Sequence, residues 1–126
     1  FGLHAGIQEL CEEFESSKTI KVHYKNEINL EERELDRHLH VFRILQELMN
    51  NSLRHGKASE IWINFKIEDE IKTCHYKDNG IGFDETNAEN QKGMGMKNID
   101  SRISFLDGTI QINSQINNGV LVVFTF

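Results

Sequence analysis

The longest helical pattern in this sequence is LDRHLHVFRILQELMNNSLRHG, residues 35–56. Its apolar residues recur every three or four positions, which places them on one face of an α-helix. An acid-rich segment leads into it, with Glu31, Glu32, Glu34 and Asp36, and Arg54, His55 and Lys57 stand near its end, an order that complements the helix dipole. Gly56 is a natural stop signal. We therefore expect a central helix that buries one face.

Shorter patterns surround this helix on both sides. Stretches in which apolar side chains alternate predict strands, and stretches with a three- or four-residue apolar spacing predict helices. The polar run DETNAENQK, residues 84–92, predicts a loop. The expected elements are a helix over 2–16, strands over 19–25, 61–67 and 71–77, a helix over 96–106, and strands over 109–114 and 120–126.

This order of elements predicts an α+β fold. Short polar turns join the strands at 61–67 and 71–77 and those at 109–114 and 120–126, so each pair is expected to form a hairpin. About three helices on one face of a mixed, mainly antiparallel sheet are the simplest way to bury all the apolar faces. We therefore expect a two-layer α/β sandwich.

The composition limits the size of the fold and the kinds of partner. Leu, Ile, Val and Phe make up 37 of the 126 residues, enough for one core, and the length leaves little for a second. The formal charge of −6 has the wrong sign for neutralising a phosphate backbone, so nucleic acid is not an expected partner. Cys11 and Cys74 match no CxxC or Cys/His ligand pattern, so we expect ordinary buried thiols in a reducing compartment.

Neither a membrane span nor a signal peptide is expected within this sequence. The longest aliphatic or aromatic run is residues 120–124, far short of the roughly 20 apolar residues of a membrane span. The sequence opens at Phe1 without Met, inside a helical pattern, and stops at Phe126 inside a strand-like run. We interpret residues 1–126 as a single domain cut from a longer chain.

Three polar side chains form a stripe on the central helix. Glu47, Asn51 and His55 are four residues apart, and each such step advances only about 40° around the helix axis. A carboxylate and a carboxamide supply oxygen ligands of the kind that Mg²⁺ takes together with phosphate oxygens and water. Arg54, beside His55, could donate to a phosphate. The alternative interpretation is an ordinary solvated helix face.

Two glycine-containing stretches are candidate ligand-binding loops. In DNGIGFD, residues 78–84, two glycines let the backbone turn and approach a flat ligand, and Asp78 could accept a hydrogen bond from a ligand amino group. The alternative is an ordinary connection between sheet elements. Gly93-Met94-Gly95 comes just before a helix start, where free N–H groups favour phosphate. It matches neither a Walker loop nor the dinucleotide fingerprint.

Taken in order, these stretches resemble a known family. ELMNNSLRH (47–55), DNGIGFD (78–84) and GMGMKNIDSR (93–102) are similar to the N box and the two glycine boxes of the sensor histidine kinase ATP-binding domain. That family belongs to the gyrase, Hsp90, histidine kinase and MutL superfamily, which implies a Bergerat-type fold. The pattern QELxxNxxRH followed by GxGxKNIxxR resembles the two-component kinases paired with nitrate-response-type regulators. The similarity runs through essentially the whole chain.

The resemblance implies a role for each matched residue in binding Mg-ATP. Glu47 and Asn51 would be the catalytic residues and the metal site, with Asn51 coordinating Mg²⁺ and Glu47 supporting the metal and its water. Asp78 would bind the adenine amino group. The other residues implied in nucleotide binding are Arg54 and His55 near the phosphates, Gly80 and Gly82 at the base, Lys92, Gly93, Met94, Gly95 and Met96 along the second glycine box, and residues 84–92 as the ATP lid.

The sequence departs from the family pattern at several positions. Met96 stands where the second glycine box usually has Leu, a volume-conserving change. Asp107-Gly108 replaces the usual Gly-Gly turn, and Val120 replaces a small hydroxyl residue; we expect both changes to lie away from the pocket. No stretch resembles the ELHD-type phosphoacceptor motif, so the fragment alone is not expected to phosphorylate itself.

The resemblance implies the catalytic domain of a two-component sensor histidine kinase, a transferase of signal transduction that uses ATP and Mg²⁺. It would present the γ-phosphoryl group to a histidine on the phosphoacceptor and dimerisation helices of its parent protein, upstream of a response regulator. We expect this segment in the cytoplasm, with a parent that is either soluble or anchored in the inner membrane. The alternatives are a non-catalytic nucleotide-binding or interaction module of the same fold and an anti-sigma-type serine kinase.

Overall fold

The computed structural model describes residues 2–18, 20–29, 34–82 and 95–126. Its elements are α1 (Leu3–Lys18), β1 (Lys21–Asn26), α2 (Leu35–Arg54), β2 (Glu60–Glu68), β3 (Ile71–Asp78), α4 (Met96–Phe105), β4 (Ile110–Ser114) and β5 (Val120–Thr125). The sequence predicts all of these elements in this order, with ends that differ by at most two residues. The predicted loop at 84–92 lies outside the described residues.

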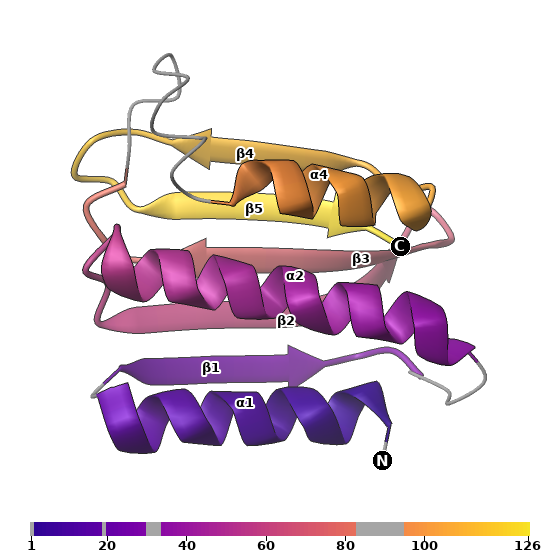
Figure 1. The fold of residues 1–126 in the computed structure, drawn as a ribbon, viewed down its shortest axis with the longest axis horizontal. Helices are drawn as coiled ribbons and strands as arrows, with labels where there is room; N and C mark the ends of the chain where they lie inside the picture. The colour runs from indigo at the N-terminus through magenta and orange to yellow at the C-terminus, as the bar shows by residue number, and fades with distance from the viewer. Residues whose placement is uncertain (1, 19, 30–33, 83–94) are drawn as a thin grey trace.

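The five strands form one mixed sheet in the order β1-β2-β3-β5-β4. β1 pairs with β2 in parallel, and the other three neighbouring pairs are antiparallel. The helices α1, α2 and α4 lie on one side of this sheet (Figure 1). The predicted α+β fold, a two-layer sandwich with a mainly antiparallel sheet, is therefore confirmed.

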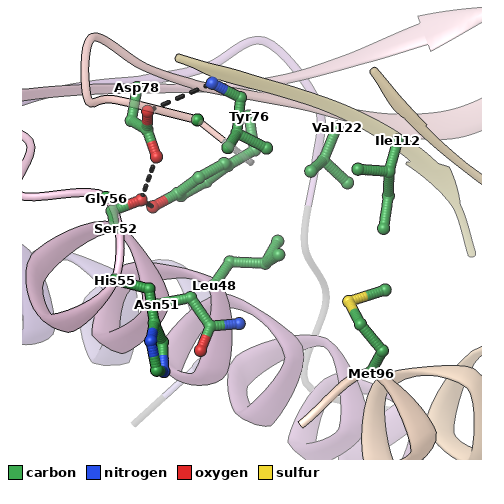
Figure 2. A pocket seen from close by; sticks show the side chains of 12 residues that line it. Leu48, Asn51, Ser52, His55, Gly56, Tyr76, Asp78, Met96, Ile112 and Val122 are labelled. Carbon is green, nitrogen blue, oxygen red and sulfur yellow. Dashed lines mark hydrogen bonds between the residues drawn. The ribbon is translucent and has the colours of Figure 1, made fainter. Parts of the chain in front are cut away.

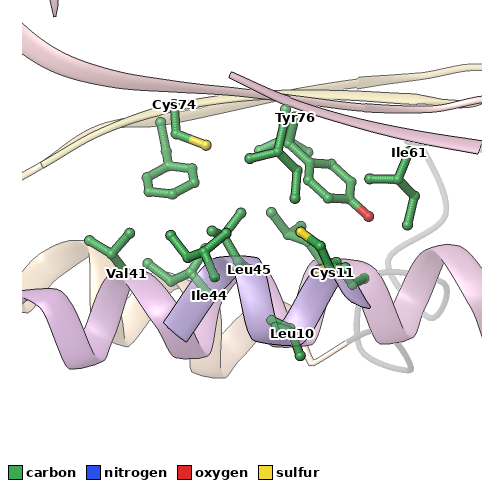
Figure 3. Close-up of a cluster of buried hydrophobic side chains, with 14 of the residues drawn as sticks. Leu10, Cys11, Val41, Ile44, Leu45, Ile61, Cys74 and Tyr76 are labelled. Carbon is green, nitrogen blue, oxygen red and sulfur yellow. The ribbon is translucent and has the colours of Figure 1, made fainter. Parts of the chain in front are cut away.

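The core lies between the helices and the inner face of the sheet (Figure 3). Alternation along β2 points Ile61, Ile63 and Phe65 toward the helices, and each is at most 1 % exposed. From the other layer, α2 inserts a buried face that includes Ile44 and Leu45. This face fixes the rotation of α2 about its own axis, and thereby the direction of every polar side chain on the helix.

The two cysteines belong to this core. Cys11 and Cys74 are both buried and free, as the sequence predicts. Burial raises the pKa of the Cys11 thiol to about 12 and raises the pKa of Cys74 well above its ordinary value. Both thiols therefore stay protonated near neutral pH and act as small apolar side chains.

Candidate functional site

A pocket lies between the second half of α2, the inner face of the sheet and the start of α4 (Figure 2). α2 forms one wall, β3, β4 and β5 form the opposite wall, and Met96 closes one side. The walls are mainly apolar, and polar groups gather where β3 ends. The lining residues are Leu48, Asn51, Ser52, His55, Gly56, Tyr76, Asp78, Gly82, Met96, Ile112, Val120 and Val122.

Asp78 is the buried carboxylate of this pocket, with 2 % of its surface exposed. Its Oδ2 accepts a hydrogen bond from Ser52 Oγ at 2.6 Å. Its Oδ1 accepts from the backbone N–H groups of Gly80 at 2.9 Å and Val120 at 3.1 Å. Three donors thus compensate the desolvation of this carboxylate and fix its orientation at the end of the pocket.

Glycines allow the chain after Asp78 to pass close to its neighbours. A Cβ on Gly80 would overlap the carbonyl oxygen of Gly56, and the next residue, Ile81, donates its N–H to that same oxygen at 2.7 Å. Gly82 has a φ of +66°, and a Cβ there would overlap the backbone oxygen of Gln115. The two glycines therefore shape the backbone that surrounds Asp78. Of these two, Gly82 lines the pocket and Gly80 does not.

The predicted stripe on α2 is divided between two neighbouring cavities. Asn51 and His55 line the pocket that contains Asp78, whereas Glu47, one turn earlier, lines a polar cavity between α2 and α4. Glu47 reaches the start of α4, since a Cβ on Gly95 would overlap its Oε1 atom. The other residues of the polar cavity are Arg43, Gln46, Asn98, Ile99 and Arg102.

The remaining predicted residues lie outside the pocket or outside the described residues. Arg54 is exposed and is not among the residues that line the pocket. Gly95 is the N-cap of α4, with a φ of +66°. Lys92, Gly93 and Met94 fall outside the described residues, as does the predicted lid.

The expected position of Val120 was wrong. Val120 lines the pocket and donates its backbone N–H to Asp78. The reason is strand order: β5 pairs with β3 as well as β4, and the register places Val120 directly opposite Asp78. Asp107 and Gly108, the other replaced turn, are not among the pocket residues.

Ser52 and Tyr76 are site residues that the sequence analysis missed. Both are at most 2 % exposed, and the Tyr76 hydroxyl bonds Ser52 Oγ, which in turn bonds Asp78. Two weak signals were present. Tyr76 precedes Asp78 by two residues, and therefore shares its face of β3, and Ser52 follows Asn51 directly on the helix.

The comparison with protein families agrees with this geometry. Residues 36–126 match the family described as histidine kinase-, DNA gyrase B- and HSP90-like ATPase. The chain belongs to this family, and its two-layer architecture is the Bergerat-type ATP-binding fold of histidine kinase catalytic domains.

Similar proteins of known sequence include three bacterial kinases. The sensor histidine kinase ComP of Bacillus subtilis is 36 % identical over 88 residues, which cover 68 % of this chain and 11 % of ComP. The oxygen sensor histidine kinase NreB of Staphylococcus carnosus is 25 % identical over 96 % of this chain and 35 % of NreB. The signal transduction histidine-protein kinase/phosphatase DegS of Bacillus subtilis is 31 % identical over 82 % of this chain and 28 % of DegS. The chain thus spans about a third or less of these relatives.

Solved structures share the fold at low sequence identity. The blue-light activated histidine kinase EL346 of Erythrobacter litoralis superposes with a TM-score of 0.81 at 16 % identity, over all of this chain and 42 % of that one. The catalytic domain of histidine kinase ThkA gives a TM-score of 0.74 at 18 % identity, over all of this chain and 92 % of that one. These structures support the fold assignment.

Proposed function

We propose that residues 1–126 form a single Mg-ATP-binding catalytic domain of a two-component sensor histidine kinase. The observation that carries this proposal is the buried Asp78 carboxylate at the end of the pocket, with Asn51 and His55 on the facing helix. The apolar walls suit a flat purine base, and the carboxylate suits its exocyclic amino donor.

The residues of the α2 stripe fit the metal and the phosphates. The side-chain oxygens of Asn51 and Glu47 are the hard ligands that Mg²⁺ prefers, and they stand one helical turn apart. When bound with the nucleotide, Mg²⁺ neutralises phosphate charge. His55 lies in the same pocket and would donate to the phosphates, together with Arg54, Lys92, Gly93, Met94 and Gly95 as the family motif implies. The chain itself would contribute mainly position and charge neutralisation.

We propose that the phosphoacceptor histidine lies elsewhere in the parent protein and that a response regulator is the downstream partner. The sequence has no phosphoacceptor motif, so the γ-phosphoryl group would pass to a histidine on separate dimerisation helices and then to a response regulator. The relatives carry the names of histidine kinases, which supports a histidine as the acceptor. No helix in the described part of the chain combines the length and apolar character of a membrane span. We propose a cytoplasmic location for the domain.

Calorimetric titration tests the nucleotide site. ATP should bind, and Mg²⁺ should strengthen its binding. Asp78→Asn should weaken the binding of ATP and narrow the difference in affinity between ATP and GTP, because the amide also offers donors to the guanine carbonyl. The unsubstituted chain should bind GTP at least about tenfold more weakly than ATP. Equal binding of the two nucleotides would rule out Asp78 as the base-reading residue.

A phosphotransfer assay tests the reaction. The chain is incubated with labelled ATP alone, with a candidate acceptor helix bundle, and with a serine-containing anti-sigma substrate. Acid-labile label on the helix bundle supports the histidine kinase, and acid-stable label on serine supports the anti-sigma-type kinase. Binding of ATP without transfer to either supports the non-catalytic module. Stoichiometric label on the isolated chain would contradict the proposal that the acceptor lies elsewhere.

A further inference from the structure

A chain of hydrogen bonds runs through the wall of the pocket behind Asp78 (Figure 2). Tyr76 Oη lies 2.5 Å from Ser52 Oγ, and Ser52 Oγ donates to Asp78 Oδ2 at 2.6 Å. Serine has only one hydroxyl hydrogen, and this hydrogen is directed to the carboxylate. Tyr76 must therefore donate to Ser52, so the whole chain of hydrogen bonds points toward Asp78.

The burial of these groups enforces this direction. Tyr76 is 1 % exposed, and Ser52 and Asp78 are each 2 % exposed. The Tyr76 hydroxyl makes no other hydrogen bond to the part of the chain that the structure describes. Burial also raises the pKa of the Tyr76 phenol well above its ordinary value, so the hydroxyl stays a donor. A different orientation of Ser52 would leave buried groups unpaired, which is unfavourable.

We infer that Ser52 and Tyr76 make the pocket selective for 6-amino over 6-oxo purine nucleotides by keeping the serine hydrogen turned away from the base. Both are positioning residues, because they act through Asp78. The inference rests on the proposed function, in which Asp78 receives the base. Asp78 alone does not explain the selectivity, because a carboxylate could also accept the N1–H of a 6-oxo purine.

The chemistry of the two bases explains the selectivity. The comparison concerns the group at C6: adenine carries an amino donor there, which the acceptor oxygens of Asp78 and Ser52 suit. Hypoxanthine offers N1–H as a donor, which Asp78 could accept, but its carbonyl oxygen then needs a donor of its own. Ser52 is the hydroxyl beside Asp78 in the pocket lining, and its hydrogen is committed to the carboxylate. The carbonyl would therefore be buried without a partner.

Removing the tyrosine hydroxyl should release Ser52. In Tyr76→Phe the ring volume stays nearly the same, and Ser52 no longer needs to accept a hydrogen bond from that side. Because Tyr76 then no longer holds Ser52 Oγ in place, the serine side chain can change rotamer and donate to the carbonyl of hypoxanthine while Asp78 accepts N1–H. ITP is the appropriate probe, because it differs from ATP at this edge and lacks the 2-amino group of GTP.

The test measures dissociation constants for ATP and ITP by calorimetry in the unsubstituted chain and in four variants. In Tyr76→Phe the ratio of the ITP to the ATP constant should fall about threefold to tenfold. In Ser52→Ala, and in the double variant with Tyr76→Phe, the ratio should not fall, because the serine hydroxyl that would donate to the carbonyl is gone. Tyr24→Phe is the matched control: its hydroxyl bonds His4 at 3.0 Å instead, so its ratio should match that of the unsubstituted chain.

Three results would overturn the inference. They are an unchanged ratio in Tyr76→Phe, an equal fall in Tyr24→Phe, and a fall in the double variant that equals the fall in Tyr76→Phe. The proposed function fails in a different way, namely when Asp78→Asn keeps both the ATP affinity and the ratio of the unsubstituted chain. Thermal unfolding of each variant checks that the comparison is made between folded proteins.

Discussion

Gly95, the residue before α4, lies directly against the carboxylate of Glu47 on α2. A Cβ at this position would overlap Glu47 Oε1, and the φ of +66° is one that L side chains adopt with strain. The absence of a side chain therefore brings the start of α4 next to the acid that the proposal assigns to the metal. Gly95 therefore has a structural role toward α2, besides the phosphate contact that we propose for it.

Gly95→Ala should disturb both the fold and the site. The left-handed backbone at this residue predicts a loss of unfolding free energy of about 1 to 2 kcal/mol, and the overlap should push Glu47 aside and weaken Mg-ATP binding. Gly6→Ala is the matched control. A Cβ there would lie 3.7 Å from the Phe42 ring, an ordinary contact, and Gly6 lies inside α1, so this change should be neutral or stabilising. Urea unfolding and calorimetry measure both effects, and equal effects of the two substitutions would contradict the explanation.

Asn51→Ala should remove the metal-dependent part of nucleotide binding. The gain in ATP affinity on adding Mg²⁺ should fall by about tenfold or more, while the helix persists because Ala is the better helix former. Asn50→Ala makes the same change one residue earlier, at a position that does not line the pocket. Titrations of ATP with and without Mg²⁺ compare the two. An unchanged Mg²⁺ gain in Asn51→Ala would exclude the metal assignment.

The elements of the fold could be predicted because each depends on local periodicity. The apolar spacing of residues 35–56 specifies the buried face of α2, and the four-residue spacing of Glu47, Asn51 and His55 places them on one stripe of that helix. Asp78 could be predicted as a site residue for a similar reason, since it ends an alternating strand and precedes two glycines. These conclusions need no knowledge of which strands are neighbours.

The misplaced and missed residues depend on packing between distant elements. Val120 enters the pocket because β5 pairs with β3, and no local pattern states that pairing. Ser52 and Tyr76 are 24 residues apart, and their contact is decided by which turn of α2 lies over which residue of β3. A sequence pattern predicts the face on which a side chain lies, but not its partner across the layer.

His38 is a buried histidine on α2, 4 % exposed, and both of its ring nitrogens are buried without a hydrogen-bond partner among the described residues. Burial lowers its pKa, as do Lys72 and Arg37, while Glu34 acts in the opposite direction. The unfolded state then binds a proton at a higher pH than the folded state does. The contribution of His38 to the unfolding free energy should therefore be fully present above the ordinary histidine pKa of about 6.5 and should be lost as the pH drops below that value.

His38→Leu should flatten this pH dependence. Leucine removes the titrating ring, so the difference in unfolding free energy between the variant and the unsubstituted chain should grow in the variant's favour as the pH falls from 7.5 to 5.5. The growth is limited to about 1.4 kcal/mol per pH unit, the contribution of one proton. Urea unfolding at several pH values measures it. A difference that stays constant across this range would show that His38 does not titrate in this way.

The hydrogen-bond chain from Tyr76 to Asp78 also predicts non-additive stabilities. Ser52→Ala should lower the unfolding free energy by about 1 to 3 kcal/mol, because it leaves the buried Tyr76 hydroxyl without a partner and removes one donor from Asp78. Tyr76→Phe should lower it by only about 0.5 to 1.5 kcal/mol, since without nucleotide Ser52 still donates to the carboxylate. In the double variant no tyrosine hydroxyl is left unpaired, so the combined loss should be smaller than the sum of the single losses by about 1 kcal/mol.

A parallel cycle of Ser52→Ala with Tyr24→Phe, whose hydroxyl bonds His4, should be additive within about 0.5 kcal/mol. Additivity in the Tyr76 cycle as well would mean that Ser52 and Tyr76 do not act as a pair.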